Sequence, residues 1–130
     1  MERAVEWLVA ITSLAVGVSH MVRSADWADA YRQLHACGQP GAFMNGGLCL
    51  APGAGIVAAH GSWDWPGAVI TLFGWLLVGK GVVCLLAPGL ALQSMERGSR
   101  SPRGFLVAGA VMTALGGWAL YCIWHGSQGL

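Results

Sequence analysis

Four apolar runs, each long enough to cross a membrane, constrain this sequence more than any other feature. They cover residues 4–22, 41–60, 65–87 and 105–124. An α-helix of about 20 residues crosses a hydrocarbon core about 30 Å thick. Lipid offers the backbone no hydrogen-bond partners, and none of the runs alternates in polarity like a strand of a membrane barrel. Each run is therefore predicted to be a membrane-spanning helix.

The scarcity of charge leads to the same fold class. Among the 130 residues, 55% are hydrophobic and 10% are charged, whereas soluble domains carry roughly 25% charged residues. Much of the surface must then face a lipid bilayer, and the length suits one domain. A net charge of +1 and scattered basic residues argue against nucleic acid as a partner. We predict a single domain over residues 1–130, an all-α, integral membrane bundle of four transmembrane helices.

The connection between the first two runs has a helical periodicity of its own. Ser24 suits the N-cap position, and Asp26 follows in the first turn. Apolar side chains then recur at spacings of three and four residues, at Trp27, Ala30, Tyr31 and Leu34. Asp29 and Arg32 lie off this stripe. The pattern predicts a short amphipathic helix that lies in the membrane interface between transmembrane helices 1 and 2.

Arginine is distributed unequally between the two ends of the predicted helices. Two connections, residues 23–40 and 88–104, share one end and carry Arg23, Arg32, Arg97, Arg100 and Arg103. The other end holds Arg3 and a tight turn at residues 61–64. The positive-inside rule predicts that the arginine-rich end is cytoplasmic and that both termini are outside. The expected location is a bacterial inner membrane, with the first run kept as a helix because no small-x-small cleavage site follows it.

Lys80 is the most promising candidate for a ligand or ion path. Ionisable residues inside a membrane are functional candidates by default. However, Lys80 lies about 10 Å from the cytoplasmic end of its helix, where a lysine also snorkels. Pro52 predicts either a helix break of the kind that lines transporter sites or a tolerated kink. Asn45 and Thr71 are assigned to the same path, or else to hydrogen bonds between helices.

Polar side chains also gather at the predicted outer end, as a cluster of Glu6, His60, Asp64 and His125. Histidine with carboxylate binds Zn²⁺ or Cu²⁺ or relays protons, although polar groups at helix ends are ordinary. The spacing matches no metal motif, and no particular metal or cofactor follows from it. The four cysteines form no C-x-x-C and are interpreted as free thiols, most of them buried.

The overall layout resembles that of DoxX-like small membrane proteins, some of which are linked to quinones. The resemblance rests on four short helices with an interfacial helix after the first. It covers the layout of most of the chain and transfers no site residue.

Three functions are compatible with these features. The first is a non-enzymatic helix-packing protein, acting as a homo-oligomer or as an accessory subunit of a larger membrane complex. It is favoured by the 20 glycines and by the lack of catalytic motifs such as G-x-S-x-G or H-E-x-x-H. The second is an oligomeric transporter or channel protomer that uses Lys80 and the Pro52 break. The third is a quinone- or metal-linked redox protein that uses the outer cluster.

Overall fold

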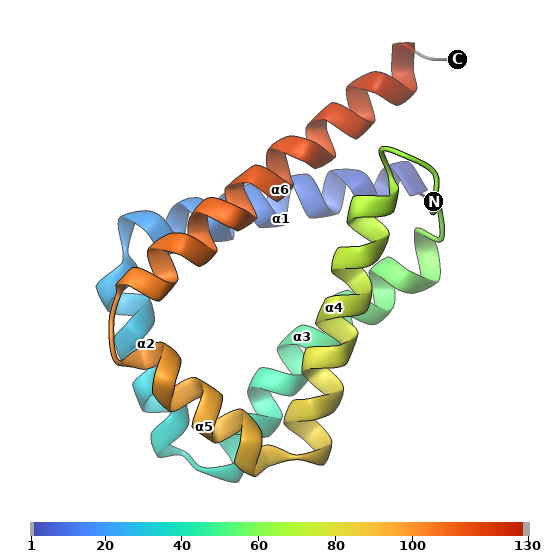
Figure 1. Ribbon diagram of the computed structural model, residues 1–130. Helices are drawn as coiled ribbons and strands as arrows, with labels where there is room; N and C mark the ends of the chain where they lie inside the picture. The colour runs from blue at the N-terminus through green and yellow to red at the C-terminus, as the bar shows by residue number, and fades with distance from the viewer. Residues whose placement is uncertain (1, 129–130) are drawn as a thin grey trace.

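The computed structural model describes residues 2–128, which form six α-helices joined by short turns (Figure 1). The helices are α1 (Glu2–Val22), α2 (Ser24–Ala36), α3 (Gln39–Ala59), α4 (Ala68–Leu86), α5 (Pro88–Ser99) and α6 (Arg103–Gln128). Four of them, α1, α3, α4 and α6, are long and apolar enough to cross a membrane. The described residues contain no strand. The predicted all-α class with four membrane-compatible helices is confirmed.

Turn residues move some helix ends by a few positions from those predicted. α4 begins at Ala68 rather than at 65, because residues 60–67 form an irregular turn that ends in Pro66 and Gly67. α3 begins directly after Gly38, whose φ of 70° turns the chain back from α2. Glycine adopts this left-handed conformation without a steric penalty.

Helix α5 was not anticipated, because the sequence predicted only a charged connection over residues 88–104. Pro88 occupies the first turn of α5, where its missing N–H costs nothing. Ala91, Met95 and Ser99 are buried at intervals of four residues and form the inner face. The charges of Glu96 and Arg97 drew attention to the outer face and concealed this periodicity.

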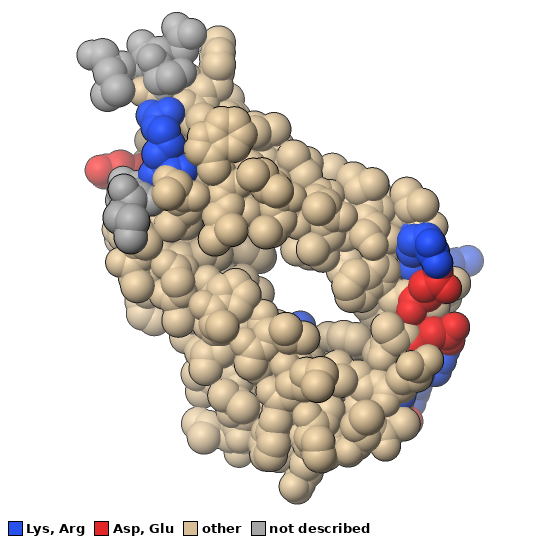
Figure 2. Space-filling view, turned by 180° about the vertical axis from the view of Figure 1, so that it is seen from behind, with Lys and Arg blue, Asp and Glu red and all other residues tan. Residues whose placement is uncertain are grey.

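The four long helices are arranged as two antiparallel pairs, α1 with α6 and α3 with α4, rather than around one common axis. Most contacts between helices occur within these pairs. The two pairs meet at one end and diverge toward the other. At the wide end, α2 and α5 pack against each other as a third pair that connects the first two. The three pairs form the sides of a triangle (Figure 1). The space-filling view shows an opening through the molecule between them (Figure 2).

The α3–α4 pair is held together by glycines spaced seven residues apart. Gly46 and Gly53 of α3 face Gly74 and Gly81 of α4. A Cβ atom at Gly53 would lie 2.8 Å from the Leu77 Cβ, and one at Gly81 would lie 2.7 Å from the Leu50 Cβ and 2.8 Å from the Leu50 backbone N. All three distances are shorter than those that real Cβ atoms show. The two backbones therefore approach as closely as they do only because these positions lack side chains.

The α1–α6 pair is also held together by close approach of the two backbones at glycines. A Cβ atom at Gly17 would lie 2.7 Å from the Thr113 backbone N, and one at Gly116 would lie 2.6 Å from the Leu14 Cγ. A Cβ atom at Gly109 would lie 2.6 Å from the Gly17 carbonyl oxygen. Lipid gives helices no hydrophobic reason to associate, so close van der Waals contact is what stabilises each pair.

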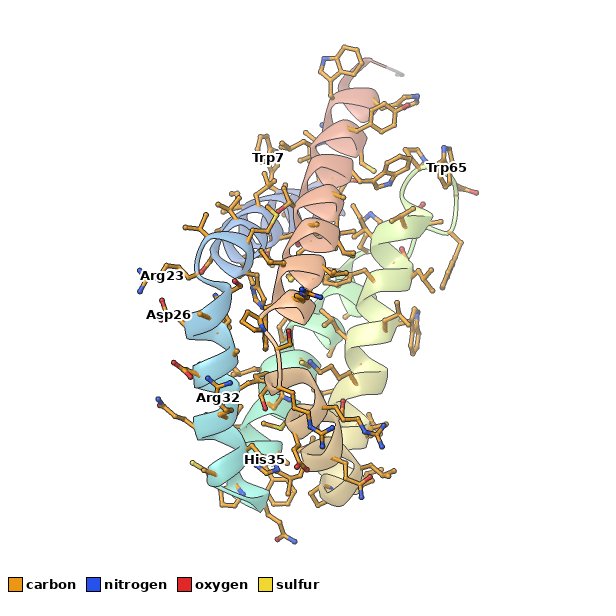
Figure 3. All side chains as sticks on the ribbon, turned by 60° about the vertical axis from the view of Figure 1, so that its left-hand side comes forward. Trp7, Arg23, Asp26, Arg32, His35 and Trp65 are labelled. Carbon is orange, nitrogen blue, oxygen red and sulfur yellow. The ribbon has the colours of Figure 1, made fainter. Side chains whose placement is uncertain are left out.

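The narrow end of the triangle contains the main hydrophobic core, to which both pairs contribute. Its buried members are Val5, Val9, Ala10, Ile56, Ile70, Ala119, Cys122 and Ile123. At the wide end, α2 follows its predicted stripe in part, because Ala30 is exposed and Ala28 is the buried residue instead. Trp27, Tyr31 and Leu34 are half-buried, and the Trp27 indole N–H donates to the Ser19 hydroxyl at 2.9 Å. Arg23, Asp26 and Arg32 project outward (Figure 3).

Candidate functional site

Two cavities lie at opposite ends of α4, and each contains residues that the sequence had singled out. The first has a volume of about 220 Å³ and is called here the Lys80 cavity. It is formed where α4 meets α2, α3 and α5. Its lining consists of Tyr31, Asn45, Gly79, Lys80, Val83, Cys84, Leu90, Ala91, Ser94 and Met95. Lys80 therefore borders a cavity, which is one of the environments expected of a functional lysine.

The Tyr31 hydroxyl organises the polar side of the Lys80 cavity. Lys80 Nζ donates to the Tyr31 Oη at 3.3 Å, and Asn45 Nδ2 donates to the same oxygen at 3.4 Å. Asn45 is 6% exposed, and its Oδ1 accepts from the Cys49 thiol at 3.8 Å. Because the Tyr31 oxygen accepts both of these bonds, its own proton is left available to an acceptor in the cavity.

Lys80 has no acidic partner among the described side chains. The nearby acids at the wide end of the molecule are engaged elsewhere, in the pairs Arg23–Asp26, Arg32–Asp29 and Arg100–Glu96. The Arg32 guanidinium also donates to the Ser99 carbonyl oxygen at 2.7 Å and so joins α2 to α5. The cavity thus presents a cation and a hydroxyl donor in surroundings that are mostly apolar.

Pro52 lies outside both cavities. Of the two alternatives for Pro52, a helix break and a tolerated kink, the structure shows no break, because α3 continues without interruption from Gln39 to Ala59. Pro52 is exposed, and the helix tolerates the single backbone hydrogen bond that the proline removes.

The second cavity, of about 160 Å³, lies at the narrow end and brings the predicted outer cluster together. All four members of that cluster line it: Glu6, His60, Asp64 and His125. They come from α1, the end of α3, the turn over residues 60–67, and α6. We call it the His60 cavity, since His60 is its most deeply buried polar residue, at 1% exposure.

Thr71 follows the second of its two alternatives, a hydrogen bond between helices, because it contacts His60 at the end of α3 and does not line the Lys80 cavity. Its hydroxyl lies 2.6 Å from the Ser62 carbonyl oxygen and 3.2 Å from the His60 carbonyl oxygen. Both carbonyls are acceptors, so the single hydroxyl proton points to them. The His60 Nδ1, 2.9 Å from the Thr71 Oγ1, must then be the donor of that bond.

This assignment determines what the other nitrogen of His60 can do. With the proton on Nδ1, the neutral ring presents a lone pair at Nε2, which lies 3.5 Å from the Glu6 Oε1. A lone pair facing a carboxylate is repulsive. The contact is attractive only when a proton lies between them, on the imidazole or on the carboxyl group. Glu6, at 15% exposure, and His60 therefore form a contact that joins α1 to the end of α3.

The geometry does not combine these residues into a metal centre. Among the described residues, no group of three or more histidine, cysteine, aspartate or glutamate side chains is placed to hold a metal ion. Nδ1 of His60 is occupied by Thr71, and the ring of His125 lies against Tyr121 with centroids 5.6 Å apart.

The sequence reasoning missed two contributors to these sites. Tyr31 was interpreted only as part of an apolar stripe, although its hydroxyl bonds Lys80. Ser94 enters the Lys80 cavity from α5, a helix that was not anticipated.

Comparisons with protein-family models, with curated protein sequences and with solved structures found no match for this chain.

Proposed function

We propose that this chain is an integral membrane protein that works by packing against other helices, as a homo-oligomer or as an accessory subunit of a larger membrane complex. The observation that supports this most directly is a stripe of small residues on the exposed side of α3, formed by Gly47, Ala51 and Gly55. A Cβ atom at Gly47 or Gly55 would meet nothing within 4 Å. These glycines therefore serve no close contact between helices within residues 2–128.

The contrast with the buried glycines gives the stripe its meaning. Gly46 and Gly47 are adjacent, yet the first is closed off by α4 and the second faces open space. Gly53 and Gly55 repeat the contrast two turns later. A second stripe, with Ala110, Ala114 and Gly117, is exposed on α6. Small residues at spacings near four allow the backbone of another helix to approach closely in lipid.

The proposed placement in the membrane puts α2 and α5 at the cytoplasmic face of a bacterial inner membrane, with both termini outside. The uneven distribution of arginine supports this orientation. The aromatic residues fit it as well, because Trp7 and Trp65 lie toward the end of the molecule opposite Arg32 and His35 (Figure 3). Tryptophan is enriched where helices leave the hydrocarbon core.

Cysteine labelling in intact cells tests this orientation. Cys37 is exposed at the α2–α3 turn and provides a native reporter, whereas the other three cysteines are buried. We expect Cys37 to resist a membrane-impermeant maleimide until the cells are opened. A cysteine introduced by Gly61→Cys, in the exposed turn at the opposite end, should react at once. The reverse pattern would show that the proposed orientation is inverted.

Association is tested by adding bulk to the α3 stripe. We expect Gly55→Leu to reduce self-association, or copurification with a partner, by about tenfold or more, because the branched side chain keeps a neighbouring helix at a distance. The measurement is cross-linking in native-like bilayers over a range of protein-to-lipid ratios. Leu76→Phe, which adds bulk at an exposed position on α4, is the control and should have little effect. A wild-type protein that is monomeric at every ratio and copurifies with nothing would contradict the proposal.

A second candidate, a transporter or channel protomer for a small solute, is favoured by one observation. Lys80 borders a cavity and has no acidic partner among the described side chains. The continuity of α3 through Pro52 removes the other feature on which that candidate relied.

A further inference from the structure

The donors of the Lys80 cavity are incompletely used. The ammonium group of Lys80 has three N–H donors, of which one bonds the Tyr31 hydroxyl and a second is directed to the Cys49 side chain. The Tyr31 hydroxyl accepts twice and retains its own proton. The cavity therefore offers two donors, one N–H of the ammonium and the Tyr31 O–H, and its protein atoms supply no anion. Such a group of donors matches the oxygens of a phosphate.

The size and lining of the cavity indicate how much of a ligand it takes. Its volume of about 220 Å³ is smaller than the roughly 300–1,000 Å³ of sites that enclose a whole small ligand. Apart from the polar group, the walls are largely apolar, with Val83, Leu90 and Met95 among them. A charged head group fits this space if the rest of the molecule extends into apolar surroundings.

The opening between the helix pairs supplies those surroundings. Lys80 and Phe73 are seven residues apart and so share one face of α4. Phe73 packs against the core at the narrow end, while Lys80 borders the cavity near the wide end. This face of α4 therefore runs along the opening, and a Lys or Arg side chain is visible at the rim of the opening (Figure 2).

We propose that the Lys80 cavity binds the phosphate of an anionic phospholipid, with an acyl chain lying in the opening between the two helix pairs. Lys80 is the charged contact, and the Tyr31 hydroxyl is the neutral donor. The proposal relies on the membrane placement given above but not on self-association. A lipid is favoured over a soluble anion because Lys80 lies on a membrane-compatible helix, about 9 Å before its end at Leu86. Arg97 and Arg103, which have no acidic partner among the described side chains, add to the attraction for anionic lipid.

Lipid-dependent stabilisation tests the proposal. Purified protein in neutral detergent is titrated with phosphatidylglycerol, phosphatidylcholine or inorganic phosphate, and thermal unfolding is followed. We expect phosphatidylglycerol to raise the melting temperature progressively, as a ligand of the folded state does. Phosphatidylcholine and inorganic phosphate should produce little change. An equal shift in melting temperature with phosphatidylcholine would show that the site does not select an anionic lipid. An equal shift with inorganic phosphate would show that the ligand is a soluble anion and not a lipid.

Variants locate the effect at the cavity. Lys80→Met should fold and should bind phosphatidylglycerol at least about tenfold more weakly, since it removes the charged contact. Arg97→Gln removes an exposed cation from the same end and should retain most of the shift. If Lys80→Met does not fold, Tyr31→Phe decides, because it removes the free donor while keeping the ring against Phe105. An undiminished shift in the deciding variant would overturn the site.

Discussion

Replacing Gly53 by leucine should separate α3 from α4 and strongly lower the stability of the protein. The new Cβ would lie 2.8 Å from both the Leu77 Cβ and the Val78 backbone N. A backbone atom cannot rotate away, so the helices must move apart. Inserting bulk into a packed interior costs about 1–3 kcal/mol where the surroundings can adjust, and here we expect the upper end or more. Thermal unfolding in detergent, followed by helical circular dichroism, measures the loss.

The matched control lies two residues away. Gly55→Leu introduces the same side chain on the same helix, where a Cβ meets nothing within 4 Å. It should leave the melting temperature nearly unchanged while reducing association, as proposed above. Equal destabilisation by Gly53→Leu and Gly55→Leu would show that the two glycines do not face opposite environments, and it would refute the division between pairing and exposed faces.

These glycines also illustrate what the sequence could and could not predict. Length and hydropathy were sufficient for the four long helices, because crossing a hydrocarbon core imposes both. The same uniform hydropathy conceals which face of each helix is buried, since lipid and protein interior favour similar residues. Gly46 and Gly47 therefore looked equivalent in sequence, and the splayed arrangement of two pairs could not be anticipated.

The two polar sites differ in how predictable they were. The His60 cavity collects the ends of three helices and one turn, so topology alone placed Glu6, His60, Asp64 and His125 together. The Lys80 cavity depends on which helices contact one another, and the sequence does not reveal this. Tyr31 reaches Lys80 from 49 residues away, and Ser94 arrives on a helix whose periodicity was masked by its charges. Thr71 does not line the Lys80 cavity, because nine residues of α4 separate it from Lys80, about 13 Å along the axis.

Removing the Thr71 hydroxyl should weaken the junction between the two helix pairs at the narrow end. Thr71→Val keeps the shape of the side chain but leaves the His60 Nδ1 proton and the Ser62 carbonyl oxygen without their partner. Each buried polar group left unsatisfied costs about 1–3 kcal/mol, so we expect a loss of about 2–6 kcal/mol for the two groups together. Thr71→Ser should recover most of it, because serine restores the hydroxyl.

The reason for so large an effect is that Thr71 fixes which nitrogen of His60 faces Glu6. Without the hydroxyl, the Nδ1 proton has no acceptor, and the ring gains by turning away from the Glu6 carboxyl group. The link between α1 and α3 would then be lost together with the local bond. Thr12→Val is the control, since Thr12 is exposed and its hydroxyl donates to the Leu8 carbonyl oxygen of its own helix at 2.7 Å; its effect should stay within about 0.5 kcal/mol. Nitrogen-15 NMR of the His60 ring reports the predicted Nδ1–H directly, and a proton found on Nε2 with a bare Nδ1 would contradict the assignment.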